Sequence, residues 1–243
     1  MINKLVLQSV ISKYYLNGLV ESVKWEIKNN QLLIRFMSPN KDMLGRVTLN
    51  SFDLADTDVA IYNTSALNKL INITAGDLIL NVSRLNKSST KLFIADTKYN
   101  LEYSLADMML ISTVADIDEP EKYAVEIDLN EEIVAALIKA KGAMSDTDHL
   151  IIETSLSFDH DQLINFIIGD DSDHSNKITY SIPCLSNTNI SLPFDANVFR
   201  EILAANKDIE KGKISVNEEG LMKIIFEGEK TTSIYFLVRK NEQ

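Results

Sequence analysis

Histidines and clustered carboxylates are the side chains of this sequence that could hold a metal ion or transfer protons. His160 lies in the run SFDHDQ, His174 in DDSDHSN and His149 in SDTDHL. The run around His174 places carboxylates close together, but it lacks the glycine and the terminal glutamate of an EF-hand calcium loop. We therefore expect solvated acidic turns at these positions, without a metal ion.

Phosphate-binding loops and nucleophile motifs are absent from the sequence. Its eight glycines form neither GxGxxG nor GxxxxGK[ST], and no serine lies in the context of a nucleophile elbow. The single cysteine, Cys184, cannot form an internal disulfide and is expected to be a small, buried apolar residue. The sequence thus gives no support for an enzyme or for a bound cofactor.

Basic residues gather in four segments with helical spacing, near residues 3–14, 65–73, 130–141 and 196–207. These segments contain seven basic and three acidic side chains, although the whole chain has a formal net charge of −11. The bases are Lys4, Lys13, Lys69, Lys139, Lys141, Arg200 and Lys207, and the acids are Glu131, Glu132 and Glu201. Basic helical faces attract the phosphates of nucleic acid, while acid-rich strands on the other side of the sheet would repel them. The alternative is that these lysines are ordinary solvated residues of surface helices.

Apolar residues predict which side of each helix is buried. The expected buried residues are Leu7, Val10, Ile11 and Tyr14, then Leu67, Leu70 and Ile71, then Ile133, Val134 and Leu137, and finally Val198, Phe199, Ile202 and Leu203. Lys69 lies opposite its apolar neighbours on a helical wheel, whereas Lys141 lies near the apolar stripe and is expected to snorkel. Asp128 or Asn130 is the expected N-cap of the third helix, and Asp195 that of the fourth.

Short strands occupy most of the remaining sequence. Runs such as VKWEIKN, QLLIRFMS and QLINFIIG are rich in β-branched and aromatic residues and are bounded by turn residues, which is typical of antiparallel sheets. The order of helices and strands repeats at an offset of roughly 130 residues. We therefore predict an α+β protein of two similar domains, each with two helices on one face of a curved sheet. The expected boundaries are 1–107 and 123–243, joined by a linker at 108–122 that contains Pro120 and several acids.

Size and composition fit a soluble protein. The chain has 243 residues and a mass of 27.3 kDa, with 45% hydrophobic and 24% charged residues, which suits folded domains with a substantial core. We expect no signal peptide and no membrane span, because no apolar stretch is long enough for either. Together with the single cysteine, these features favour an intracellular protein.

Three local runs carry a resemblance to a known family: Asp58-Val59-Ala60-Ile61-Tyr62 before a short leucine-rich helix, Phe93-Ile94-Ala95-Asp96, and Phe226-Glu227-Gly228-Glu229. They resemble the sliding clamps of T4-type bacteriophages, the processivity factors of the phage DNA polymerase. The order of elements agrees over most of the chain, while the local identity is dense only near these runs. The sequence differs from the family in the longer acidic turn at residues 170–174 and in its C-terminal residues.

The resemblance implies a clamp fold (DNA clamp) and a non-enzymatic protein without a cofactor. Three subunits would close head to tail into a ring that encircles duplex DNA, independently of its sequence, and tethers the viral replicative DNA polymerase. An ATP-dependent clamp loader would place the ring on DNA in the cytoplasm of the infected bacterial host. The DNA-facing residues would be Lys4, Lys13, Lys69, Lys139, Arg200 and Lys207.

Clamp-like proteins also capture short partner peptides in an apolar pocket near the domain junction. Met108, Met109, Leu110 and Ile111 provide adaptable apolar side chains there. The alternative is that this run is a buried strand that crosses between the domains.

Other classes of function stay open at this point. An acidic, β-rich virion structural protein would also use repeated antiparallel domains with exposed strand edges, but it would not need basic helical faces. An enzyme of unknown reaction is a weaker alternative, because no catalytic motif supports it.

Overall fold

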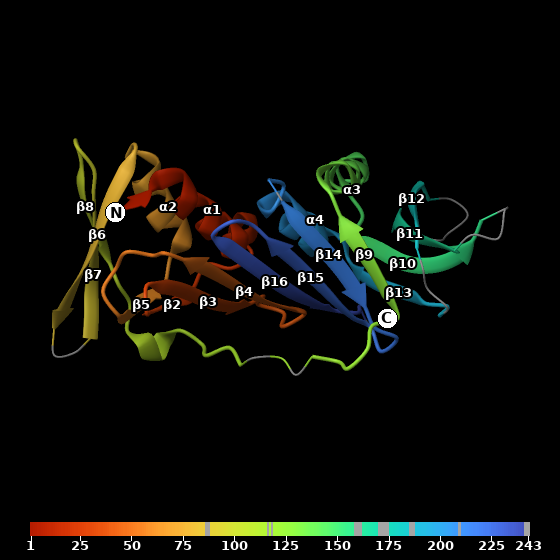
Figure 1. The fold of residues 1–243 in the computed structure, drawn as a ribbon, viewed down its shortest axis with the longest axis horizontal. Coiled ribbons are helices and arrows are strands. Elements are labelled where there is room, and N and C mark those ends of the chain that lie inside the picture. Colours follow the sequence, from red (N-terminus) through yellow and green to blue (C-terminus); the bar gives the residue numbers. More distant parts are fainter. Residues whose placement is uncertain are drawn as a thin grey trace. The chain divides into compact units, whose positions relative to one another are not determined.

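The computed structural model describes residues 1–85, 88–115, 117, 119–157, 162–169, 175–184, 188–208 and 210–240. The chain divides into two compact units, Met1–Asp116 with Glu229–Ser233, and Ile117–Gly228 with Ile234–Gln243. Both halves of the chain have the same order of elements: a strand, a helix, four strands, a second helix and three strands (Figure 1). The repeat predicted from the sequence is therefore confirmed in the order of the elements.

The first unit contains two helices, α1 (Lys4–Tyr15) and α2 (Thr64–Asn72), and two 3-10 turns, η1 (Leu16–Gly18) and η2 (Met108–Leu110). Its strands are β1 (Ile2–Asn3), β2 (Val23–Lys28), β3 (Gln31–Met37), β4 (Met43–Asn50), β5 (Thr57–Ile61), β6 (Asp77–Leu85), β7 (Ser88–Ala95) and β8 (Asn100–Ser104). They form two antiparallel arrays, in the orders β5-β2-β3-β4 and β1-β6-β7-β8.

The second unit repeats this topology with the helices α3 (Glu131–Ala143) and α4 (Ala196–Ala205). Its strands are β9 (Val125–Leu129), β10 (His149–Leu156), β11 (Gln162–Gly169), β12 (Lys177–Pro183), β13 (Ser191–Asp195), β14 (Lys211–Val216), β15 (Leu221–Glu227) and β16 (Thr231–Val238). The first residues of β16, up to Ser233, are assigned to the first unit. The strand orders are β13-β10-β11-β12 and β9-β14-β15-β16. Each array therefore has a counterpart in the first unit.

Alternation of side chains explains how the sheets of the first unit build its core. In β2, Val23, Trp25 and Ile27 are buried while the residues between them are more exposed. Strands β2 and β3 are joined by Asn29 and Asn30, whose φ angles of 52° and 61° match a two-residue hairpin turn. Asparagine tolerates this left-handed conformation better than most residues, so the turn fixes the register of the two strands.

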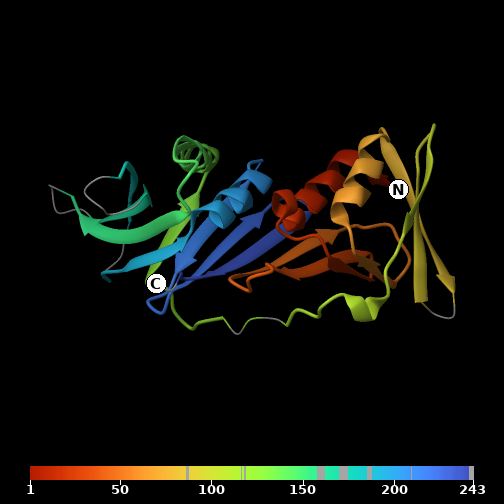
Figure 2. The same cartoon turned by 180° about the vertical axis from the view of Figure 1, so that it is seen from behind.

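The helices lie on one face of the sheets in each unit (Figure 2). They bury the residues predicted for them except Leu70 in α2 and Ile133 in α3, which are half-buried. The buried residues include Leu7, Val10, Ile11 and Tyr14 in α1, and Val198, Phe199, Ile202 and Leu203 in α4. The side chain of Asn130 accepts a hydrogen bond from the N–H of Ile133, and Asp195 accepts from the N–H groups of Asn197 and Val198. Asn130 and Asp195 are thus confirmed as N-caps.

Helix α4 is shorter than the sequence pattern predicted. It ends at Ala205 because Asn206 turns inward, where its amide donates to the carbonyl of Ile202 at 2.8 Å and to the hydroxyl of Tyr235 at 2.9 Å. Lys207 therefore lies beyond the helix, on an exposed loop. In the described part of the chain, no helix has both the length and the apolar character to cross a membrane.

Candidate nucleic-acid interface

Helices α1 and α2 present one continuous polar surface. They are tied together below it, where Thr64 Oγ1 donates to the buried hydroxyl of Tyr14 at 3.4 Å, and at the surface, where Gln8 Nε2 donates to Asn72 Oδ1 at 2.6 Å. Burial raises the pKa of Tyr14, so its hydroxyl stays neutral. These two contacts hold the helix pair as one rigid surface.

The outward side of this pair contains no acidic side chain. Neither helix has an acidic residue, and their N-caps, Asn3 and Asn63, are neutral. Lys69 is exposed in the last turn of α2, and no described side chain forms an ion pair or hydrogen bond with it. Lys13 is half-buried, with its ammonium 3.3 Å from Ser9 Oγ. Lys69 can therefore attract an anion without displacing a carboxylate of the described residues.

Lys4 has a structural role that the helical wheel does not reveal. Its ammonium donates to the carbonyls of Asn72 at 2.8 Å and Thr74 at 2.5 Å, at the C-terminal end of α2. Carbonyls at a helix C-terminus lack intrahelical partners and carry partial negative charge, so a lysine stabilises them. The charge of Lys4 is thus already used within the first unit.

The helix pair of the second unit carries both signs of charge. Lys139 is exposed on α3, but Glu131 and Glu132 are exposed in the first turn of the same helix. Arg200 of α4 forms an ion pair with its neighbour Glu201. The basic charge of this pair is therefore largely offset.

Two further bases of the second unit contribute less than the sequence pattern suggested. Lys141 is only 4% exposed, and its ammonium donates to the carbonyls of Met144 and Ser145, each at 3.1 Å, beyond the C-terminus of α3. The expectation that it lies near the apolar side is confirmed, but the expectation that it snorkels is wrong, because its ammonium binds these carbonyls and does not extend into solvent. Lys207 is exposed on the loop after α4, where exposed Asp208 follows it directly.

The outer sheet face of the first unit corrects the expectation that strands carry the acid. On the side of β5-β2-β3-β4 away from the helices lie four basic and two acidic side chains: Lys24, Lys28, Arg35 and Arg46, with Glu26 and Asp58. Many exposed acids lie in loops instead, among them Asp53, Asp56, Asp146, Glu218 and Glu219. Turns favour aspartate, and some of these loops also contain glutamates. A charge count over segments that combine strands and turns therefore assigned the acid of the turns to the strands.

The segment Met108–Ile111 is a surface feature of the first unit and not a strand. Met108–Leu110 form the turn η2, in which Met109 is 92% and Leu110 68% exposed, while Ile111 is buried. The carboxylate of Asp107 accepts from the N–H of Met109 at 2.8 Å and fixes the start of the turn. Two large apolar side chains are thus held out into solvent by a capped backbone.

Contacts on both sides anchor this segment to the first unit. The N–H of Ala106 donates to the carbonyl of Ala60 in β5 at 3.1 Å, and Lys24 Nζ donates to Thr113 Oγ1 at 2.9 Å. Because Lys24 points to the sheet side opposite the helices, Thr113 lies on that side as well. The sequence offered no signal for the Lys24 contact, which joins residues 89 positions apart.

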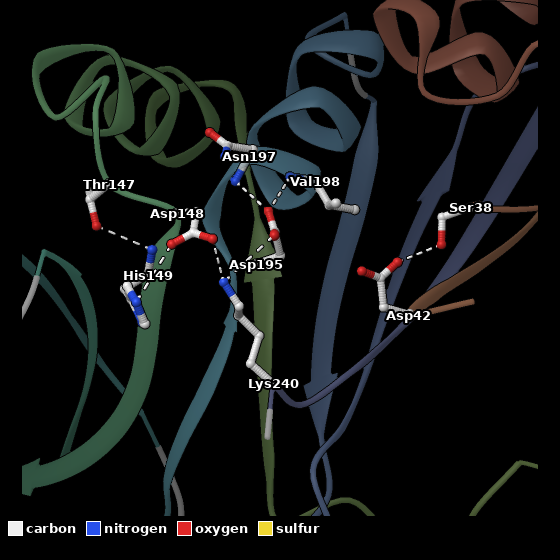
Figure 3. A network of polar contacts seen from close by, with 9 residues as sticks. All are labelled: Ser38, Asp42, Thr147, Asp148, His149, Asp195, Asn197, Val198 and Lys240. Atoms are coloured by element: carbon white, nitrogen blue, oxygen red, sulfur yellow. Dashed lines mark hydrogen bonds and ion pairs between the residues drawn. The ribbon is translucent and has the colours of Figure 1, made fainter. Parts of the chain in front are cut away.

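Lys240 anchors the C-terminal segment of the second unit (Figure 3). Its N–H donates to the carbonyl of Pro193 at 2.8 Å, and its ammonium lies 2.6 Å from Asp148 Oδ2 and 3.8 Å from Asp195 Oδ2. The hydrogen bond from Lys240 is the main cause that lowers the pKa of Asp148 below its ordinary value. The cluster of charges therefore has a structural use.

The histidines gain no metal partners in the described part of the chain. His149 Nε2 lies 3.5 Å from Asp148 Oδ1, and the other carboxylate oxygen of Asp148, Oδ2, binds Lys240. Among the residues that the structure describes, no group of three or more histidine, cysteine, aspartate and glutamate side chains could hold a metal ion. His160, His174 and the acidic turn before His174 lie outside the described residues.

Comparison with known proteins identifies the fold. No protein-family model matches the chain, and no curated protein matches it in sequence. The structure is similar to that of Proliferating Cellular Nuclear Antigen from Entamoeba histolytica, with a TM-score of 0.76 and 15% identity over 98% of this chain and 96% of that chain. It is also similar to A. fulgidus PCNA, solved with the C-terminal region of FEN-1 bound, with a TM-score of 0.76 and 14% identity over 100% of this chain and 98% of that chain. The predicted two-domain clamp fold is thus confirmed.

Proposed function

We propose that this chain is a sliding clamp that encircles duplex DNA and tethers the replicative polymerase of a T4-type bacteriophage. The observation that carries the proposal is the acid-free outer surface of α1 and α2 in a protein whose net charge is −11. The clamp fold adds support, and so does the resemblance of the local sequence runs. The protein would act as a scaffold, without catalysis and without a cofactor.

A clamp has to surround DNA without holding it at one place. Exposed Lys69, together with amides and hydroxyls on α1 and α2, attracts phosphates but cannot read base edges, which suits movement along any sequence. Retention would come from the closed ring, because duplex DNA cannot leave it sideways. We therefore expect weak binding to linear duplex at physiological salt.

A head-to-tail homotrimer is the assembly that we propose for the ring. Strand β8 lies at one end of the array β1-β6-β7-β8, and β12 lies at one end of β13-β10-β11-β12. No other described strand pairs with the outer edge of either. An edge strand from each unit thus offers unpaired backbone groups, so β8 of one subunit can pair with β12 of the next.

Polymerase and loader would dock on the surface segment Met108–Ile111. Its exposed methionine is polarisable and flexible, which suits contacts with the apolar side chains of several partner peptides. An ATP-dependent loader would open the ring and close it on DNA, in the cytoplasm of the infected host. The domain boundaries at residues 107 and 123, with the linker 108–122 between them, belong to the same proposal.

Replacing Met108 and Met109 by serine is expected to weaken binding of the cognate polymerase by about tenfold or more, because burial of a methionine side chain contributes about 1.5–3 kcal/mol. Calorimetry with the polymerase measures the change. The matched control is Leu85→Ser, which alters another side chain of the first unit that is 67% exposed, and which should leave the affinity unchanged. Unchanged polymerase binding by the folded double variant would remove this segment from the partner site.

Primer extension on a circular single-stranded template tests the function as a whole. With the cognate polymerase and loader, the protein is expected to lengthen the products of a single binding event, and ATP should be required. Linearising the loaded DNA should release the protein, since a ring slides off a free end. Product lengths that do not respond to the protein would contradict the proposal and favour the virion structural protein. Tight binding to linear duplex at physiological salt, before loading, would contradict retention by topology.

A further inference from the structure

We infer that the two helix pairs do not share the DNA equally: α1 and α2 bind the phosphates, through Lys69, Lys13 and the amide pair Gln8–Asn72, whereas α3 and α4 contribute little attraction. This inference rests on the proposed function, and it names the residues of the chain that would contact the duplex. It follows from the charges that face each pair.

No acidic residue lies on α1 or α2, and the acids nearby bind the ends of these helices. Asp77 accepts from the side chain of Asn3, the N-cap of α1, at 3.2 Å, and Asp96 accepts from the N–H of Ala75, after α2, at 2.8 Å. The half-buried Glu21 accepts from the N–H of Ser65 at 3.0 Å and so neutralises the start of α2. Lys69 lies in the last turn of the same helix. The ammonium of Lys4 covers the carbonyl of Asn72 at this helix end and that of Thr74 beyond it. Lys69 itself has no ion pair or hydrogen bond with a described side chain, so its charge is available to an anion.

Gln8 and Asn72 add neutral donors beside this charge. Their side chains meet at 2.6 Å across the gap between α1 and α2, and Asn72 is exposed. In this arrangement the Nδ2 group of Asn72 keeps both of its N–H donors for another partner, since its oxygen receives the bond from Gln8. Amides of this kind bind phosphate oxygens without a net charge, so each contact is weak and easily exchanged.

The opposite balance holds for α3 and α4. Glu132 and Lys139 are seven residues apart in α3, which places them on the same face about 10 Å from each other. This separation is about one Debye length at 0.1 M salt, so the carboxylate reduces the attraction of Lys139 for a phosphate. The carboxylate of Glu201 pairs with Nη1 of Arg200 and so offsets the charge of this guanidinium toward an anion.

Charge reversal at one exposed lysine of each pair provides the test. Lys69→Glu and Lys139→Glu change the same residue type on helix surfaces without breaking a hydrogen bond or ion pair between described residues. Fluorescence anisotropy measures the affinity of each full-length variant for a fluorescein-labelled linear duplex between about 50 and 200 mM salt. Lys69→Glu is expected to lower the affinity about fivefold or more at the lowest salt and to reduce the salt slope by about 1, because one phosphate contact is lost. Lys139→Glu should stay within about twofold of the unmodified protein.

A third variant separates the amides from the charges. Gln8→Ala combined with Asn72→Ala should lower the affinity about threefold but leave the salt slope unchanged, because an amide displaces no counterion. Equal losses for Lys69→Glu and Lys139→Glu, or a larger loss for Lys139→Glu, would overturn the unequal sharing while the clamp function stands. Failure of the unmodified protein to bind the labelled linear duplex at every salt concentration would also overturn the unequal sharing. The clamp function would then be tested separately, by retention of the protein on circular DNA.

Discussion

Replacing Thr179 by proline is expected to convert the assembled protein into single chains and to abolish processive synthesis. Strand β12 turns alternate backbone groups toward β11 and toward its free edge. The N–H of Cys184 donates to the carbonyl of Gln162, opposite it in the register, which directs the groups of Cys184, Ile182 and Tyr180 toward β11. The N–H of Thr179 therefore points outward, to where a neighbouring subunit would pair.

Proline at this position removes an outward donor and leaves the pairing with β11 intact. A loss of about 1.4 kcal/mol at one interface is a tenfold change in its equilibrium constant, and a closed trimer contains three such interfaces. The trimerisation constant should thus fall by about a thousandfold. Light scattering at micromolar concentration should show a mass near the 27.3 kDa of one chain for the variant, and three times that mass for the unmodified protein.

Thr179→Ala is the control, because it removes the same side chain and keeps the N–H. It should remain trimeric. The same reasoning applies on the other edge, where the N–H of Leu105 donates to the carbonyl of Thr90, so that Glu102 and Ser104 direct their backbone groups outward from β8. An unmodified protein that is monomeric at micromolar concentration, or a Thr179→Pro variant that stays trimeric, would refute pairing through β12.

Replacing Gly45 by alanine is expected to destabilise the first unit by about 3 kcal/mol, at the upper end of overpacking effects. Gly45 in β4 lies directly opposite Phe36 in β3, and an added Cβ would lie 2.2 Å from Phe36 Cζ and 2.3 Å from Cε2. Phe36 is 1% exposed, and its ring centroid is 6.3 Å from that of Tyr14 in α1. The Phe36 ring therefore has no open space to move into, and an alanine at residue 45 would push it against helix α1.

Urea unfolding monitored by circular dichroism measures this loss. Gly142→Ala is the matched control, because Gly142 lies in α3 with no atom within 4 Å of an added Cβ, and it should stabilise the protein by about 0.8 kcal/mol. Combining Gly45→Ala with Phe36→Leu should restore part of the loss, since the smaller side chain vacates the position. A Gly45→Ala variant as stable as the unmodified protein would show that the Phe36 ring can turn aside at no cost.

Much of the fold could be predicted because its signals are local. The alternation in VKWEIK or QLLIRFM and the spacing of Leu7, Val10, Ile11 and Tyr14 depend on neighbours within one strand or helix. The caps Asn130 and Asp195 are equally local, since each bonds the first turn that follows it. Strand β1 escaped prediction, because two residues carry no periodic signal and are fixed only by pairing with Asp77 and Leu78.

The candidate site could be predicted only in outline, because its details depend on contacts that are distant in sequence. Lys4 and Lys69 look equivalent on a helical wheel, yet Lys4 bonds the carbonyl of a residue 68 positions away while Lys69 stays exposed. The amide pair Gln8–Asn72 is likewise separated by 64 positions. The contacts of Lys24 with the hydroxyl of Thr113 and of Lys141 with backbone carbonyls are likewise not placed by the sequence pattern. Composition thus indicated which segments carry basic side chains, and tertiary contacts decide which of these side chains remain available.

The proposed pairing of β8 with β12 has a consequence for how this protein is produced. Two different strand edges that pair with each other, β8 and β12, can also build open-ended filaments, which form whenever the rotation between successive copies does not close a ring. Closure at three copies would consume every such edge and leave no template for cross-β growth. Chains with β12 formed and β8 still unfolded would present one reactive end alone, so overproduction at low temperature, which slows such encounters, should favour rings over aggregates.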